Sequence, residues 1–170
     1  PDLHLSQLQI GWLNAAFATC YTLAQIPGGV LGQRYGARLM YSVIGLVGLV
    51  ATIATPLAPV VLAGTALFVA LLAAQGLLGL AQGPVFPMFA AVSQTWFPPR
   101  QWALANGGNA LIMNIGGAMT APLIVVLTAH YGWQGALMWI AVPAVLLTAA
   151  WAWYGRDTPK DHPKVTVSEL

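Results

Sequence analysis

The stretch that decides the fold is Pro27–Arg38, with the sequence PGGVLGQRYGAR. It ends one long apolar run and directly precedes another, and it carries two arginines four residues apart, Arg34 and Arg38. The paired glycines at its start relieve helix packing, and Gly36 permits a tight reversal of the chain. Two positive charges between two apolar runs indicate a loop on the cytoplasmic face of a membrane.

The composition of the whole chain supports this interpretation. Of the 170 residues, 58% are hydrophobic and only 6% are charged, whereas a soluble domain carries roughly 25% charged residues. The seven Trp and five Tyr are residue types that gather at membrane interfaces. The composition therefore argues against a soluble domain and predicts an all-α membrane protein.

Five apolar segments are long enough to cross a bilayer, because a hydrocarbon core of roughly 30 Å needs about 20 apolar residues. They are residues 10–31, 39–55, 60–92, 103–129 and 133–154. Pro56 and Pro59 are expected to end the second segment. The third is longer than one crossing needs, so we expect it to tilt or to extend into an interface.

The basic residues predict the orientation. All six follow the first, third or fifth segment, at Arg34, Arg38, Arg100, Arg156, Lys160 and Lys164. We therefore expect the start of this chain outside and its end in the cytoplasm. An outside start without a signal peptide suggests that a helix precedes it. Residues 156–170 are expected to begin a cytoplasmic linker, in which Asp157 and Asp161 belong to a hydrated charge cluster.

The opening stretch resembles the loop between the second and third helices of major facilitator superfamily transporters, whose pattern is G-x-L-x-D-R-x-G-x-R. The residues that fit are Gly29, Leu31, Arg34, Gly36 and Arg38. Gln33 stands at the acidic position of the pattern and departs from it. The resemblance implies that the chain is the second to sixth helices of an N-terminal half, and that these six residues form a gating-loop motif at the inner face.

A second motif lies in the third segment. QGLLGLAQGPVFP, residues 75–87, resembles the fourth helix of the superfamily, where R-x-x-x-G-x-x-E-G is common in organic-anion carriers. Gly79 and Gly83 match, whereas Gln75 replaces the arginine and Gln82 the glutamate. The chain is most similar to the anion:cation symporter branch, which imports organic acids such as sugar acids.

No Asp, Glu, Lys or Arg lies within the five apolar segments. Intramembrane charge is the usual mark of ion coupling, and amides instead offer hydrogen-bond donors and acceptors without charge. The candidate residues for a substrate cavity are therefore Asn14, Tyr21, Gln25, Gln75, Gln82, Asn106, Asn109 and Asn114. The alternative is that these amides only bond neighbouring membrane helices.

The resemblance implies a secondary active transporter of a small polar solute, an organic acid or sugar acid, that works by alternating access in the cytoplasmic (inner) membrane. Its expected partners are the substrate, the lipid bilayer, a coupling ion (H⁺ or Na⁺), and the first helix and C-terminal half of the transporter. The alternatives are an exporter of the same fold, a non-transporting membrane sensor or scaffold, and an inactive fragment. We expect no enzyme, cofactor, metal site or nucleic-acid binding, and Cys20 is expected to be a small buried hydrophobe.

Overall fold

The computed structural model describes residue 3 and residues 5–161, most of which are helical. The α-helices are α1 (Gln7–Tyr35), α2 (Ala37–Val61), α3 (Gly64–Gln82), α4 (Val85–Trp96) and α5 (Trp102–Tyr154), and two short 3-10 turns are η1 (Pro99–Gln101) and η2 (Pro159–Asp161). The described residues contain no strand. The predicted all-α class is confirmed.

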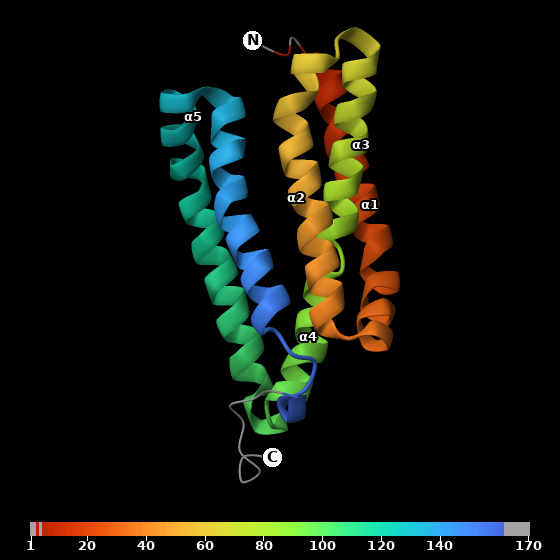
Figure 1. Ribbon diagram of the computed structural model, residues 1–170, viewed down its shortest axis with the longest axis vertical. Coiled ribbons are helices and arrows are strands. Elements are labelled where there is room, and N and C mark those ends of the chain that lie inside the picture. Colours follow the sequence, from red (N-terminus) through yellow and green to blue (C-terminus); the bar gives the residue numbers. More distant parts are fainter. Residues whose placement is uncertain (1–2, 4, 162–170) are drawn as a thin grey trace.

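The helix α5 consists of two antiparallel arms (Figure 1). The backbone at Gly132 leaves the helical region, with φ 70° and ψ 170°, a conformation that glycine adopts without the steric cost of a Cβ. The first arm, residues 102–131, therefore runs antiparallel to the second, residues 133–154. This reversal falls between the fourth and fifth apolar segments.

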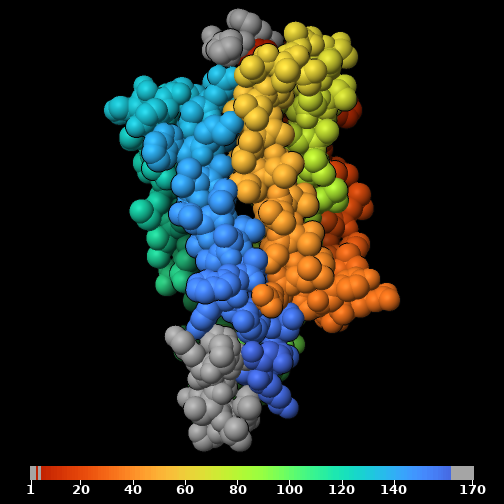
Figure 2. All heavy atoms as spheres, in the orientation of Figure 1, coloured from red at the N-terminus to blue at the C-terminus, as the bar shows by residue number. Residues whose placement is uncertain are grey.

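The helices lie along one long axis (Figure 1). α1 packs mainly on α3, and α2 packs on both α3 and α5. In space-filling view, α2 and the second arm of α5 touch along most of their length (Figure 2). The α1–α2 junction, the α4–α5 junction and the segment after α5 lie toward the same end of the molecule (Figure 1). The basic residues of these junctions therefore share one end, and Lys164 lies outside the described residues.

The expectation that Pro56 and Pro59 end the second segment is wrong, because α2 continues to Val61 with both prolines inside it. A proline ring fits helical φ, and the main cost is a lost N–H and crowding of the carbonyl four residues earlier. Near a helix end few bonds are lost. The buried Pro56 also gains a partner, since Gln134 Nε2 donates a hydrogen bond of 3.3 Å to its carbonyl oxygen.

The third apolar segment forms two helices that meet at Gly83 and Pro84. Both residues keep nearly helical dihedral angles, with φ −53° and ψ −47° at Gly83 and φ −69° and ψ −16° at Pro84. Pro84 and Pro87 lack the N–H groups that would bond the carbonyls of Leu80 and Gly83. The hydrogen-bond ladder is thus interrupted without a reversal of the chain.

Three of the described helical stretches are long and apolar enough to cross a membrane: Ala37–Val61, Gly64–Trp96 and Pro99–Tyr154, the last of which contains both arms of α5. The 29-residue α1 is not among them. Amide and hydroxyl side chains, such as Asn14, Thr22 and Gln25, interrupt its apolar sequence. A membrane crossing at residues 10–31 therefore stays a prediction.

Glycines bring α1 and α3 into close contact. Gly79 and Gly83 lie against the backbone of α1 at Phe17 and Tyr21, where a Cβ on either glycine would collide with a carbonyl oxygen. Cys20, half-buried, lies at the same crossing. In a membrane, helices associate by such close packing of small residues rather than by the hydrophobic effect. Gly79 and Gly83 therefore serve the packing of α1 on α3.

Replacing Gly79 by alanine should destabilise the protein by about 1–3 kcal/mol, the usual cost of forcing extra atoms into a packed interface. A Cβ at Gly79 would lie 2.9 Å from the Tyr21 nitrogen, whereas one at Gly48 would lie 3.7 Å from the Ala81 Cβ, an ordinary contact. Thermal unfolding of the full-length protein in detergent, compared between Gly79→Ala and the control Gly48→Ala, measures the difference. Equal unfolding temperatures would contradict the packing role.

Candidate functional site

The candidates on α1 lie at different depths of the helix. Tyr21 is half-buried and stacks on Phe17 with ring centroids 5.9 Å apart. Its backbone lies at the crossing with α3. Gln25, one turn further, is half-buried, whereas Asn14 is exposed. Tyr21 and Gln25 therefore lie near the α1–α3 contact, and Asn14 lies on an open surface of the described residues.

Gln75 and Gln82 are seven residues apart on α3, which places them on one face of the helix. Gln75 is half-buried, and Gln82 is exposed as the last residue before the Gly83–Pro84 bend. Because α1 crosses α3 at Gly79, between the two glutamines, they lie on either side of this contact along the helix. The role of the two glutamines as cavity residues stays a prediction.

The asparagines of α5 lie on its first arm. Asn106 Nδ2 donates to the Trp102 carbonyl and Asn114 Nδ2 to the Ala110 carbonyl, each at 2.8 Å, and Asn109 Nδ2 lies 3.9 Å from the Met113 sulfur. All three contacts stay within the arm, and residues 110–126 are exposed throughout. The alternative role of these amides, bonding between helices, is not what the described contacts show. A partner for them would have to approach this open surface.

The gating-loop motif forms a compact unit around the α1–α2 junction. Gly29 and Gly32 pack on α4, where built Cβ atoms would lie 3.3 Å from Pro87 Cβ and 2.8 Å from Met88 Cγ. Leu31 is 40% exposed, and Arg34 lies 5.4 Å from the ring centroid of the neighbouring Tyr35. The motif therefore joins α1 to α4 as well as to α2.

Arg38 is the residue of this motif with the longest reach. Its guanidinium donates to the carbonyl oxygen of Ala152 near the end of α5, through Nε at 3.1 Å and Nη2 at 2.8 Å. Carbonyls at a helix C-terminus carry partial negative charge, so a cation is stabilising there. Arg38 thus connects the first turn of α2 with the last turn of α5.

Asp157 is the functional candidate that sequence reasoning missed. Its Oδ1 accepts a hydrogen bond of 2.8 Å from the backbone N–H of Arg38, 119 residues away. Asp157 is exposed, as the expected hydrated charge cluster requires, but the sequence did not reveal that it also accepts a hydrogen bond from a distant helix. The signal in the sequence was indirect: Gly36 precedes α2 without a side chain that could cap it, which leaves the first N–H groups of α2 to water or to a distant acceptor.

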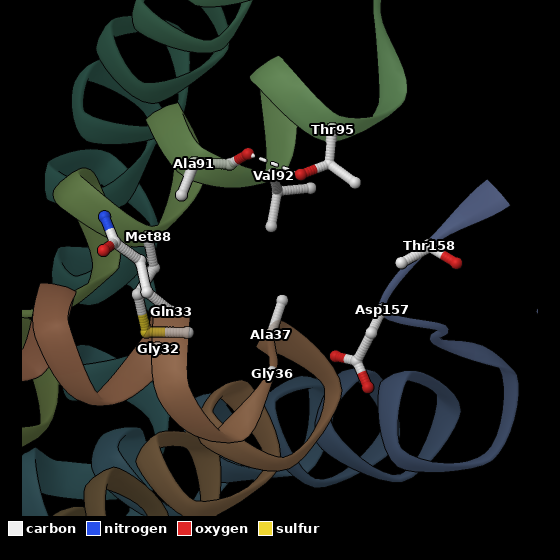
Figure 3. A pocket seen from close by; sticks show the side chains of 10 residues that line it. All are labelled: Gly32, Gln33, Gly36, Ala37, Met88, Ala91, Val92, Thr95, Asp157 and Thr158. Carbon is white, nitrogen blue, oxygen red and sulfur yellow. Dashed lines mark hydrogen bonds between the residues drawn. The ribbon is translucent and has the colours of Figure 1, made fainter.

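A pocket of about 280 Å³ lies between the α1–α2 junction, α4 and the segment after α5 (Figure 3). Gln33 lies on one side and the Asp157 carboxylate on the other (Figure 3). None of the eight cavity candidates lines this pocket, and its lining contains no basic side chain. A carboxylate without a cation does not attract an organic anion, so the pocket suits a structural role in the loop.

The chain is similar over nearly its whole length to proteins that are named as transporters. A family model described as Major Facilitator Superfamily matches residues 1–170. The chain is 30% identical to a probable sulfoacetate transporter of Cupriavidus necator, covering 99% of this chain and 38% of that protein. It is 28% identical to a probable galactarate/D-glucarate transporter of Escherichia coli (99% and 38% covered) and 28% identical to a hexuronate transporter of Bacillus subtilis (96% and 37% covered).

The chain thus spans less than two-fifths of the length of these curated relatives. The family match nevertheless covers every residue, and its expectation of long apolar helices agrees with the described fold. The resemblance carried by Pro27–Arg38 is confirmed, and the protein is a multi-pass membrane protein. The chain belongs to the Major Facilitator Superfamily.

Proposed function

We propose that this chain is part of a secondary active transporter that moves a small organic acid, such as a sugar acid, by alternating access. The observation that carries the proposal is the match of the whole chain to a transporter family, together with relatives named for sulfoacetate, galactarate/D-glucarate and hexuronate. All of these solutes are small organic acids with several polar groups. A cavity lined by amides suits the polar oxygen atoms of such solutes, because amides supply both hydrogen-bond donors and acceptors.

The proposed binding surface combines Tyr21 and Gln25 of α1 with Gln75 and Gln82 of α3. The support is the close α1–α3 crossing, which holds the two helices at a backbone distance that only glycine allows. Asn14 and the asparagines Asn106, Asn109 and Asn114 are proposed as further cavity residues on surfaces open in this chain. Because the apolar segments contain no cation, the charge that attracts an organic anion would come from the rest of the transporter.

The proposed location is the cytoplasmic membrane, with α1 starting outside and the segment after α5 inside. This orientation rests on the basic residues at one end of the molecule and on the preference of Lys and Arg for cytoplasmic loops. H⁺ or Na⁺ is proposed as the coupling ion. No acidic side chain lies within the apolar segments, so the coupling group would also come from the rest of the transporter, as would the second wall of the cavity.

The same lack of charge within the segments favours a second candidate, a membrane sensor or scaffold that binds a solute without transporting it. An exporter of the same fold differs only in direction. A measurement of substrate flux, rather than of substrate binding, distinguishes both alternatives from an importer.

The full-length protein in proteoliposomes should take up labelled D-glucarate in a saturable manner, driven by a proton or sodium gradient. Sulfoacetate and a hexuronate, added in excess, identify which anionic class competes. Binding of these acids without flux would establish the sensor, and efflux driven by the same gradient would establish the exporter. Absence of both binding and flux for all three acids would contradict the proposed substrate class.

Gln75→Ala should raise KM about fivefold, as expected when one hydrogen bond of roughly 1 kcal/mol is lost from the bound substrate. Membrane insertion should remain normal, because the side chain is half-buried and alanine favours a helix. Initial uptake rates at several substrate concentrations measure the effect. Gln94→Ala, an exposed amide on α4 outside the proposed cavity, serves as the control. Unchanged KM in Gln75→Ala would contradict a cavity role for this residue.

The orientation predicts opposite labelling of two engineered cysteines. Ala63→Cys, between α2 and α3, should react with a membrane-impermeant maleimide in intact cells, whereas Gln101→Cys, between α4 and α5, should react only after permeabilisation. Both positions lie at helix junctions, and the basic residues predict that these junctions face opposite sides of the membrane. Labelling of Gln101→Cys in intact cells would reverse the proposed orientation.

A further inference from the structure

The start of α2 depends on a group that its own neighbours do not supply. The first N–H groups of a helix have no partner within the helix, and a side chain at the N-cap position usually accepts from one of them. The N-cap of α2 is Gly36, which has no side chain. Asp157 provides the missing acceptor, with its Oδ1 2.8 Å from the Arg38 nitrogen.

The opposite helix end has the complementary arrangement. Near the C-terminus of α5, the carbonyl oxygen of Ala152 accepts from both Nε and Nη2 of Arg38. A carboxylate is favourable at a helix N-terminus and a guanidinium at a C-terminus, because each opposes the partial charge of the helix dipole. The start of α2 and the end of α5 therefore cap each other. Arg38 is the second residue of α2, and Asp157 lies three residues after the end of α5.

The backbone at Gly36 is shaped around this carboxylate. Gly36 has φ 86° and ψ 154°, a region that is essentially restricted to glycine. A Cβ at this position would lie 2.5 Å from Asp157 Oδ1. In Figure 3 the Asp157 side chain lies beside Gly36 and Ala37, at the edge of the pocket. Glycine therefore both permits the turn and leaves room for the carboxylate.

A nearby acidic residue shows that these contacts are specific to position 157. Both carboxylates are exposed, but within the described part of the chain Asp161, four residues further along the same segment, accepts only from the Thr158 hydroxyl, at 2.7 Å. This contact is local to the segment, whereas the contact of Asp157 joins two helices. A general attraction between a polar segment and a basic loop would act on both carboxylates alike. Of the two, only Asp157 contacts the basic loop, so the contact depends on its position.

We propose that Asp157 and Arg38 form a reciprocal clamp that holds the start of α2 and the end of α5 as one rigid unit. Asp157 acts as a positioning residue of the gating-loop motif, because it fixes the turn that follows Gln33. The effect of the clamp on transport rests on the proposed function, whereas the clamp itself does not.

The test uses the full-length transporter with Ala37→Cys as a reporter, in a background with the other cysteines replaced. Ala37 lines the same pocket as Asp157. Asp157→Ala should raise the rate of thiol labelling at Ala37→Cys about fivefold, the size expected for the loss of one N-cap hydrogen bond. Asp157→Asn should stay within about twofold, because the amide oxygen still accepts and Asn and Asp are comparable caps. Asp161→Ala is the matched control and should have no effect.

A double-mutant comparison tests the fit at Gly36. Gly36→Ala should lower the unfolding temperature in the wild-type background more than it does in the Asp157→Ala background, because the contact with the carboxylate is then absent. Arg38→Lys keeps the charge but cannot make the paired Nε and Nη2 contact, so it should also raise labelling. If Asp157→Ala does not fold, the labelling rate of Arg38→Lys still tests the clamp.

Transport kinetics separate this proposal from the proposed function. Asp157→Ala should lower the maximal uptake rate and leave KM within about twofold, because a weakened cap acts on the helix turn rather than on bound substrate. Labelling and unfolding are measured without substrate, so a protein without flux can still show the clamp. Two results would overturn the clamp. One is a labelling rate in Asp157→Ala equal to that in Asp161→Ala, and the other is additive effects of Gly36→Ala and Asp157→Ala on the unfolding temperature.

Discussion

Much of the described structure depends on the contact of two helices across glycine, where the backbone of α3 at Gly79 and Gly83 lies directly against α1. Lipid chains are as apolar as the side chains they meet, so association depends on dispersion contacts that exist only at short range. The same approach places the bend between α3 and α4 beside Gly28 of α1, which packs on Pro84. One close crossing thereby fixes the position of three helices and of the glutamines next to it.

The other half of the arrangement is organised by helix ends rather than by helix faces. α2 joins the α1–α3 pair to the second arm of α5, and at one end the contact is made by charged groups that meet backbone atoms, Arg38 on Ala152 and Asp157 on Arg38. At the other end Gln134 donates to the Pro56 carbonyl. Polar groups thus hold the ends, where water can reach them, and small side chains hold the middle.

The sequence predicts local features of this fold well and distant ones poorly. The apolar segments, and the break between the fourth and the fifth of them, follow from composition and spacing. Pro56 and Pro59 misled the prediction because a proline near a helix end removes few backbone hydrogen bonds and its ring fits helical φ. The partnership of Asp157 with Arg38 crosses 119 residues, and no periodicity or motif records such a pair. The cavity amides could be named from the sequence, but their grouping depends on helices that pack against the open first arm of α5.

The shape of the loop at Gly36 also bears on how proteins of this kind can be recombined. The unit consists of Gly36, which has no side chain, the Asp157 carboxylate and Arg38, whose guanidinium contacts the end of α5. Its parts are more than a hundred positions apart in the sequence. A chimera that joins the first two helices of this chain to the later helices of a relative therefore contains Gly36 and Arg38 without the residues that they contact. It retains the original fit only when the incoming segment brings an acceptor of the same length to position 157.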